Sequence, residues 1–258
     1  MRLDDYLRRT GASAPRAATV EAMRALHLAH RQNILFENLD IQRGRPILLD
    51  LDALQRKLVD DRRGGYCFEH NTLFAAVLRE YGFQPATLLA RVRRGPPERW
   101  ARTHMLLRVE SEGAPWIADV GFGGSGLLEP MRLAEGSTSE QGGMTYSLRR
   151  EGIYWVLSMR DASAESDFYE FTEEPNTPAD VEIANHFTST HPESIFRKTL
   201  TIQRATTAER VILRGTLLSR FRSGVQADEP FAREQLDDVV RKVFAVELGE
   251  GPFVFEQA

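Results

Sequence analysis

The sequence predicts an α+β fold, because helical and strand patterns occupy different parts of the chain. Residues 1–84 carry apolar side chains at helical spacing, whereas residues 85–175 hold short apolar runs separated by turn residues. Residues 176–258 mix the two patterns. We therefore expect three parts with these boundaries: an N-terminal helical bundle, a central antiparallel β-barrel and a C-terminal α/β segment.

Three stretches of the first part have the apolar spacing of an amphipathic helix. They are residues 19–31, 50–59 and 71–81. Asp50 can cap the second helix with its carboxylate, and Gly82 is a natural stop for the third.

Six apolar runs of strand length fill the second part, and Pro and Gly residues separate them. They are residues 86–93, 104–110, 116–120, 145–149, 154–160 and 168–172. Serial short strands with tight turns are typical of an antiparallel sheet that closes on itself. We expect a linker at residues 173–178, where the third part begins. It should be followed by a hairpin, with strands at 200–204 and 210–214, and by a helix at 233–247.

Charge and hydropathy narrow the class of protein. The net charge is −4 and acidic and basic residues are interspersed, so nucleic-acid binding is not expected. No apolar run approaches the about 20 residues that a membrane-spanning helix needs. With one cysteine and no apolar leader pattern at the first residues, we expect a cytoplasmic protein.

The single cysteine, Cys67, follows two glycines and precedes the helical stretch 71–81. Glycines allow a tight turn that exposes the next residues, and a helix N-terminus stabilises a thiolate. An ordinary thiol is only about 3% ionised at pH 7, so a nucleophilic cysteine also needs a base. A lone buried cysteine more often serves packing, and the neighbouring residues must decide between the two.

Two polar residues in apolar strands supply a base and a residue that orients it. His104 opens the strand at 104–110, and Asp119 lies within the strand at 116–120, where an unpaired carboxylate would be costly. If these strands are neighbours, Asp119 can accept from one imidazole nitrogen while the other faces Cys67. This is the logic of a cysteine-protease-like Cys-His-Asp core.

The remaining histidines do not predict a metal site. His27 and His30 lie three residues apart on a predicted helix, and we expect them to be solvated or bonded locally. His70 is expected to point away from Cys67. No His-Glu-x-x-His or Cys-x-x-Cys pattern is present, so no metal is expected. The glycine-rich residues 121–126 lack the lysine of a phosphate-binding loop and fit a tight loop at a pocket wall.

These segments resemble the motifs of the arylamine N-acetyltransferases. The nucleophile motif Arg-Gly-Gly-Tyr-Cys-Phe-Glu-His-Asn is the most specific, and Leu35 stands where the family usually has proline. The matching segments are residues 34–39, 63–71, 103–105, 119–123 and 185–196.

The resemblance implies a ping-pong reaction with acetyl-CoA as the acyl donor and no metal. Cys67 would carry the acetyl group, His104 would relay protons and Asp119 would fix the imidazole. The acceptor would be an arylamine, a hydrazine or an N-hydroxyarylamine. The resemblance also implies that residues 176–258 act as a lid, and it leaves a homodimer open.

Matching positions imply a pocket for the acyl group and the amine. The implied pocket residues are Phe36, Val92, Thr103, Phe122, Gly123 and Phe196. Glu37 and Arg63 are expected to pair and hold the loop before Cys67. Four basic residues are candidates for CoA phosphates, with a solvated face as the alternative: Arg197, Lys198, Arg204 and Lys242.

Three other functions share parts of this pattern. An amide synthase of the same superfamily, acting on a carrier-bound polyketide, would have the same Cys-His-Asp set. A transglutaminase-like or papain-like hydrolase has the same residue order, although the double-glycine motif argues against the papain type. A noncatalytic binding protein is the third alternative.

Overall fold

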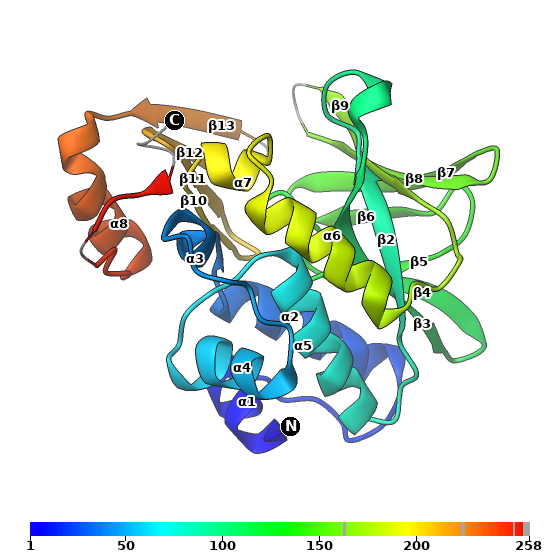
Figure 1. The fold of residues 1–258 in the computed structure, drawn as a ribbon. Coiled ribbons are helices and arrows are strands. Elements are labelled where there is room, and N and C mark those ends of the chain that lie inside the picture. The colour runs from blue at the N-terminus through cyan, green and yellow to red at the C-terminus, as the bar shows by residue number, and fades with distance from the viewer. Residues whose placement is uncertain (162–163, 223–224, 250, 255–258) are drawn as a thin grey trace.

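The computed structural model describes residues 1–161, 164–222, 225–249 and 251–254. Figure 1 shows a helical part below two separate sheets, with the larger sheet on the right and the smaller one on the left. Helix α6 (Pro178–Thr190) crosses in front of the junction between these parts. The architecture confirms the predicted α+β class.

The helical part is built from the stretches that the sequence predicted. Thr19 caps α2, and Asp50 caps α4 by accepting from the N–H of Ala53. One predicted helix is divided, because its second half is a π-helical turn, η1. The elements are α1 (Leu3–Thr10), α2 (Val20–Asn33), α3 (Leu39–Gln42), α4 (Leu51–Leu54), η1 (Gln55–Asp60) and α5 (Cys67–Glu80).

The larger sheet is antiparallel throughout and curves into a nearly closed barrel (Figure 1). Its strand order is β5-β4-β3-β2-β9-β8-β7-β6, and its interior is filled by side chains such as Leu106, Tyr146 and Leu157. The strands and one short helix are β2 (Ala86–Val92), η2 (Pro97–Arg99), β3 (Arg102–Ser111), β4 (Ala114–Ala118), β5 (Met131–Arg132), β6 (Thr138–Gln141), β7 (Met144–Glu151), β8 (Tyr154–Arg160) and β9 (Glu165–Phe171).

Strands β3 and β4 are direct neighbours, with Leu107 opposite Ala118. This register places His104 and Asp119 at the same end of the pair, as the sequence argument required. The strands β5 and β6 were not predicted.

The smaller sheet has the order β1-β10-β11-β12-β13. The predicted hairpin is confirmed, with Thr201 opposite Arg214, and three further strands extend it. The predicted C-terminal helix begins as a 3₁₀ turn and ends at Phe244. The elements are β1 (Phe36–Glu37), α7 (Ile195–Lys198), β10 (Thr201–Ala205), β11 (Arg210–Arg214), β12 (Leu217–Arg222), β13 (Val225–Pro230), η3 (Arg233–Gln235) and α8 (Leu236–Phe244).

Strand β1 belongs to the N-terminal part of the chain but pairs with β10, so the smaller sheet contains residues from both ends of the sequence. The domain boundaries 1–84, 85–175 and 176–258 therefore stay a prediction about the chain, while the smaller sheet combines strands of the first and third parts.

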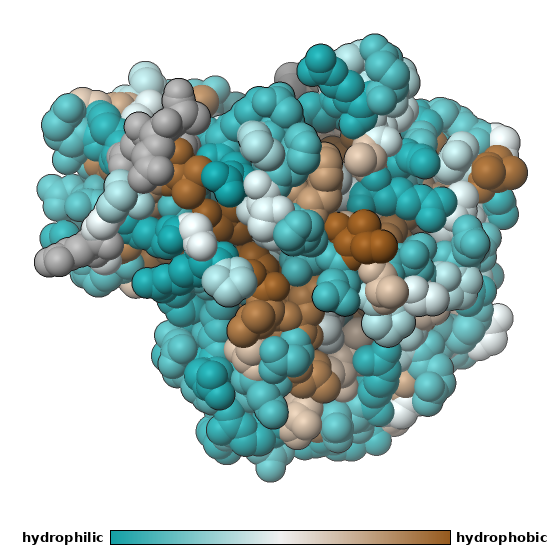
Figure 2. All heavy atoms as spheres, viewed as in Figure 1, coloured by the Kyte–Doolittle hydropathy of each residue, from teal (hydrophilic) through white to brown (hydrophobic). Residues whose placement is uncertain are grey.

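Figure 2 shows a mostly hydrophilic face, interrupted by an apolar band beside α6. Exposed apolar side chains on this part of the molecule include Leu48, between α3 and α4, and Ile183 on α6. Among the described residues, no helix combines the length and the apolar character that crossing a membrane requires.

Candidate active site

Cys67 is the first residue of α5, as predicted, and two glycines bring the preceding turn close to its neighbours. A Cβ on Gly64 would collide with the carbonyl oxygen of Leu35, and one on Gly65 would lie 2.8 Å from Oε2 of Glu69. Neither glycine has a positive φ. The pair is therefore required for close packing rather than for a left-handed turn.

His104 and Asp119 form a buried hydrogen-bonded pair beside Cys67. Nε2 of His104 lies 2.8 Å from Oδ2 of Asp119. The Cys67 sulfur lies 3.8 Å from the carbonyl oxygen of Thr103, the residue before His104. Because Nε2 is engaged by Asp119, Nδ1 is the imidazole nitrogen left for the thiol.

Asp119 is held as a carboxylate although it is fully enclosed. Burial alone would raise the pKa of Asp119, but the interaction with His104 and hydrogen bonds from Gly121 and Asn71 lower it well below its usual range. The Tyr169 hydroxyl also donates to Oδ2, at 2.9 Å. Asp119 is thus an ionised acceptor that can fix the imidazole and stabilise its protonated form.

The thiol of Cys67 is less acidic than its place at a helix N-terminus predicts. Burial raises the pKa of Cys67, and the charge of Asp119 raises it further. Desolvation therefore outweighs the helix dipole. With its pKa raised, the Cys67 thiol would need a base in order to ionise, and this is the role predicted for His104.

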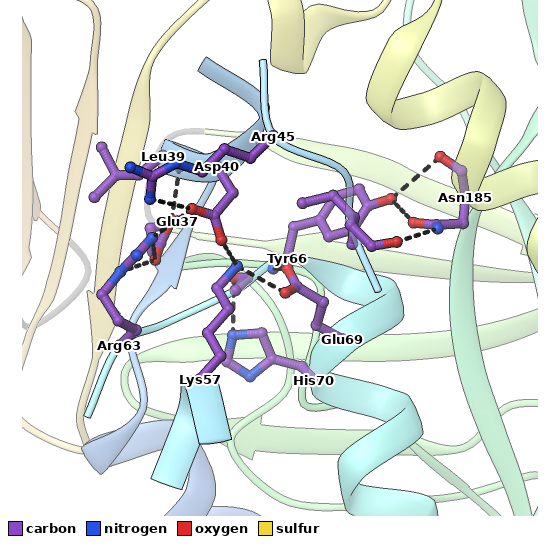
Figure 3. Close-up of polar contacts among 12 residues, drawn as sticks. Glu37, Leu39, Asp40, Arg45, Lys57, Arg63, Tyr66, Glu69, His70 and Asn185 are labelled. Carbon is purple, nitrogen blue, oxygen red and sulfur yellow. Dashed lines mark hydrogen bonds and ion pairs between the residues drawn. The ribbon is translucent and has the colours of Figure 1, made fainter. Parts of the chain in front are cut away.

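A network of paired charges supports the turn that carries Cys67 (Figure 3). Nζ of Lys57, from η1, lies 2.6 Å from Asp40 and 2.7 Å from Glu69. Glu69 in turn accepts from the N–H of Tyr66 at 3.1 Å, immediately before Cys67. Burial raises the pKa of Glu69 to about 6, against the opposing effect of Lys57.

The predicted pairing of Glu37 with Arg63 is confirmed. Nη2 of Arg63 lies 2.9 Å from Oε1 of Glu37 and 3.3 Å from Asp40 (Figure 3). The pair ties the strand β1 to the residue immediately before Gly64, and so holds the loop as expected.

A chain of buried hydrogen bonds approaches the same turn from α2. The Tyr6 hydroxyl donates to Nδ1 of His30 at 2.9 Å, and Nε2 of His30 lies 2.7 Å from Nδ1 of His70. Nε2 of His70 donates to the carbonyl of Gly65 at 3.0 Å. Nδ1 of His70 therefore accepts from Nε2 of His30, and Nδ1 of His30 accepts from the Tyr6 hydroxyl. Burial lowers the pKa of His70 to about 3. His70 points away from Cys67, as predicted.

The expectation that His27 and His30 are solvated or bonded locally was wrong, because α2 is enclosed in the core. Nδ1 of His27 donates to the carbonyl of Leu128 at 2.8 Å, and its Nε2 accepts the N–H of Asp119 at 3.1 Å. Both histidines follow buried apolar residues by four positions, Met23 and Leu26, and this spacing was the signal that could have placed them in the core.

A cavity of about 1190 Å³ lies beside the Cys67, His104 and Asp119 cluster. Cys67 and His104 are in its wall. So are five of the six predicted pocket residues, namely Phe36, Val92, Thr103, Phe122 and Phe196. Three large apolar lining residues were not predicted: Phe168, which stacks on Phe122 with ring centroids 4.8 Å apart, Phe187 and Ile195.

Gly123 is the exception, and its predicted place in the pocket wall was wrong. Its carbonyl turns inward and accepts from the buried guanidinium of Arg31. A Cβ at this position would lie 2.6 Å from the Gln203 side chain. Gly123 therefore supports the loop from behind, while Gly121 and Ser125 of the same loop reach the cavity.

Two buried arginines that sequence reasoning missed hold the glycine-rich loop. Arg31 donates to the carbonyls of Val120 and Leu127 at 3.3 and 3.0 Å. Arg210 donates to those of Gly124 and Gly126 at 2.8 and 2.7 Å. The loop is a tight pocket wall, as predicted.

The four basic residues suggested for phosphate binding do not line the cavity. Lys198, Arg204 and Lys242 face acidic neighbours instead, at 2.7 to 3.7 Å. Among the residues that the structure describes, no group of three or more His, Cys, Asp or Glu side chains could hold a metal ion.

Comparison with known proteins gives one consistent family. A family model described as N-acetyltransferase matches residues 19–253. The chain is 38% identical to an arylamine N-acetyltransferase of Mycolicibacterium smegmatis, covering 97% of this chain and 94% of the relative. It is 42% identical to one of Escherichia coli, covering 76% of this chain and 70% of the relative.

Solved structures agree with this result. An arylamine N-acetyltransferase of Mycobacterium smegmatis superimposes with a TM-score of 0.90 at 37% identity, covering 96% of this chain and 94% of that one. One of Mycobacterium marinum in complex with CoA gives 0.90 at 34% identity, covering 96% and 95%.

Proposed function

Because the chain belongs to the arylamine N-acetyltransferase family, we propose that it moves an acetyl group from acetyl-CoA to an amine through a thioester on Cys67. The chain is an acyltransferase. The observation that carries the proposed mechanism is the bond of 2.8 Å between His104 and Asp119, beside Cys67 in the cavity wall. Acceptors would be arylamines, hydrazines or N-hydroxyarylamines.

In the first half-reaction, the Cys67 proton passes to Nδ1 of His104 and the thiolate attacks the acetyl carbonyl. The bond between the carbonyl carbon and the CoA sulfur breaks. CoA takes the proton from His104 and leaves as a thiol, and the acetyl group stays on Cys67. Asp119 stabilises the imidazolium throughout, because it remains a carboxylate in the site.

In the second half-reaction, the amine nitrogen attacks the Cys67 thioester. The nitrogen gives its surplus proton to His104, the carbon–sulfur bond breaks, and Cys67 regains that proton. Aromatic walls suit a flat acceptor, since Phe122 and Phe168 already stack and Phe196 lies in the same cavity.

The test is intact-protein mass spectrometry after mixing with acetyl-CoA and no acceptor. We expect one acetyl group on the wild-type protein, none on Cys67→Ala, and removal of the group when an arylamine is added. An unmodified wild type would overturn the proposal.

Two finer expectations remain predictions. A cytoplasmic location is supported by the free thiol of Cys67, which a reducing compartment preserves. A homodimer would require a contact surface, for which the exposed side chains Leu48 and Ile183 are candidates. Sedimentation of the purified protein at several concentrations tests the second.

A further inference from the structure

Four arginines line the cavity, and one of them is already neutralised. Arg93 pairs with three carboxylates, at distances up to 2.9 Å: Glu151, Asp167 and Glu170. Glu193, which also lines the cavity, is paired with Lys198 at 2.7 Å. The positive charges that remain at the cavity are those of Arg99 near Glu193, and of Arg94 and Arg214.

Arg94 and Arg214 have no carboxylate of their own. Among residues 1–161, 164–222, 225–249 and 251–254, neither guanidinium makes a hydrogen bond or an ion pair, and both residues are exposed. They come from different parts of the fold. Arg94 follows β2 of the larger sheet, and Arg214 ends β11 of the smaller sheet.

Both guanidiniums face the same cavity. Partial burial of the Arg214 guanidinium, and then the positive charge of Arg94, lower the pKa of Arg214. Two like charges held together without a counter-ion are unfavourable in the free protein. The net charge of the chain is −4, so this positive pair is a local feature of the cavity and not the result of a generally basic surface.

We propose that Arg94 and Arg214 form an anion clamp at the cavity rim, which binds phosphate groups of the acyl donor while its thioester reaches Cys67. The inference rests on the proposed function, since it takes acetyl-CoA as the donor. A guanidinium suits this task because its planar set of N–H donors matches phosphate oxygens. A ligand bound by both arginines would also bridge the two sheets, because each arginine comes from a different sheet.

The test compares donors with and without phosphates on the same variants. The variants are Arg94→Gln, Arg214→Gln and the double variant. Arg79→Gln is the matched control, because Arg79 is exposed at the far end of α5, outside the cavity. Calorimetry measures binding of CoA, dephospho-CoA and pantetheine. Rapid-quench mass spectrometry measures acetylation of Cys67 by acetyl-CoA and by acetylpantetheine.

We expect each single variant to weaken CoA binding about 5- to 10-fold and the double variant about 30- to 100-fold. Acetylation by acetylpantetheine should stay at the wild-type rate, and so should CoA binding by Arg79→Gln. Added salt should weaken CoA binding more in the wild type than in the double variant. Comparison with dephospho-CoA shows whether the clamp holds the 3′-phosphate or the diphosphate.

Unchanged CoA affinity in the double variant would overturn the clamp. An equal loss with pantetheine and CoA would also overturn it, because that pattern indicates a damaged cavity. Failure of the proposed function is distinct: the wild type would then take an acetyl group from neither donor, whereas calorimetry would still report on the clamp.

Discussion

The floor and the rim of the cavity are built in opposite ways. The floor, made of the turn at residues 64–69 with His104 and Asp119, is buried and its polar groups are paired. The rim, made of Arg94, Phe187, Ile195 and Arg214, is exposed. Chemistry needs groups that are fixed before the substrate arrives, whereas binding can use groups that the ligand completes. Floor variants should therefore change the rate and the stability, and rim variants should change affinity.

The largest effect is expected at Asp119. Asp119→Asn should lower kcat/KM about 10³- to 10⁴-fold, because an amide no longer holds the required imidazole tautomer. Stopped-flow release of CoA measures the acetylation step. Tyr169→Phe removes another donor to the same oxygen and should cost far less. If Asp119→Asn keeps a tenth of the wild-type rate, Asp119 does not hold the His104 imidazole in the tautomer that the reaction requires.

Next comes the charge network beneath the floor. Lys57→Met should lower the free energy of unfolding by about 3–5 kcal/mol, because it leaves buried Glu69 without its cation and removes the shortest ion pair of Asp40, which keeps Arg63. Adding Glu69→Gln should restore part of the loss. The control is Arg45→Gln, which removes an exposed partner of Asp40 at 3.5 Å and should cost under about 1 kcal/mol. Urea denaturation measures all three, and equal losses for Lys57 and Arg45 would contradict the argument.

The buried histidines make the floor sensitive to acid. Burial lowers the pKa of His27 to about 4, below its value in the unfolded chain. Between about pH 6.5 and 4, His27 therefore binds a proton in the unfolded state but stays neutral in the folded state. Stability should fall across this window as the pH falls, by up to about 3 kcal/mol from His27 alone. Unfolding curves for His27→Gln should show a shallower pH dependence, and an unchanged slope would refute this assignment.

The smallest effect is expected at the apolar rim. Phe187→Ala should raise KM for a bulky arylamine about 3- to 5-fold, equivalent to roughly 1 kcal/mol, with kcat unchanged. Its free energy of unfolding should move by less than about 0.5 kcal/mol, since Phe187 is already 40% exposed. Ile183→Ala on the same helix, outside the cavity, is the control. A large loss of stability would make Phe187 part of the floor.

Sequence patterns predicted the elements whose caps, turns and hydrophobic spacing favour the same local structure that the fold contains. The cap at Asp50, the helix start at Cys67 and the hairpin pairing Thr201 with Arg214 are of this kind. Helix α6 was not found, because its apolar residues do not gather on one face. It buries Val181 and Asn185 but leaves Ile183 and Phe187 exposed, so its hydrophobic periodicity is weak.

The site was predictable where neighbouring strands bring two residues together, as for His104 and Asp119. It was not predictable where tertiary contacts decide. Arg94 and Arg214 face the same cavity only because two different sheets border it. His27 reaches the backbone of Asp119 from a helix far away in the sequence, and no local pattern reports such a bond.

The two-residue strand β1 has a consequence for the order in which the molecule is completed. Phe36 pairs with Gln203 on one side and bridges to Gly65, in the turn before Cys67, on the other. A growing chain folds from its N-terminus as it leaves the ribosome, so the helices can form early. Strand β1, however, gains its partner in the smaller sheet only after β10 has been synthesised. The last contacts around the nucleophile's turn should therefore form late in synthesis.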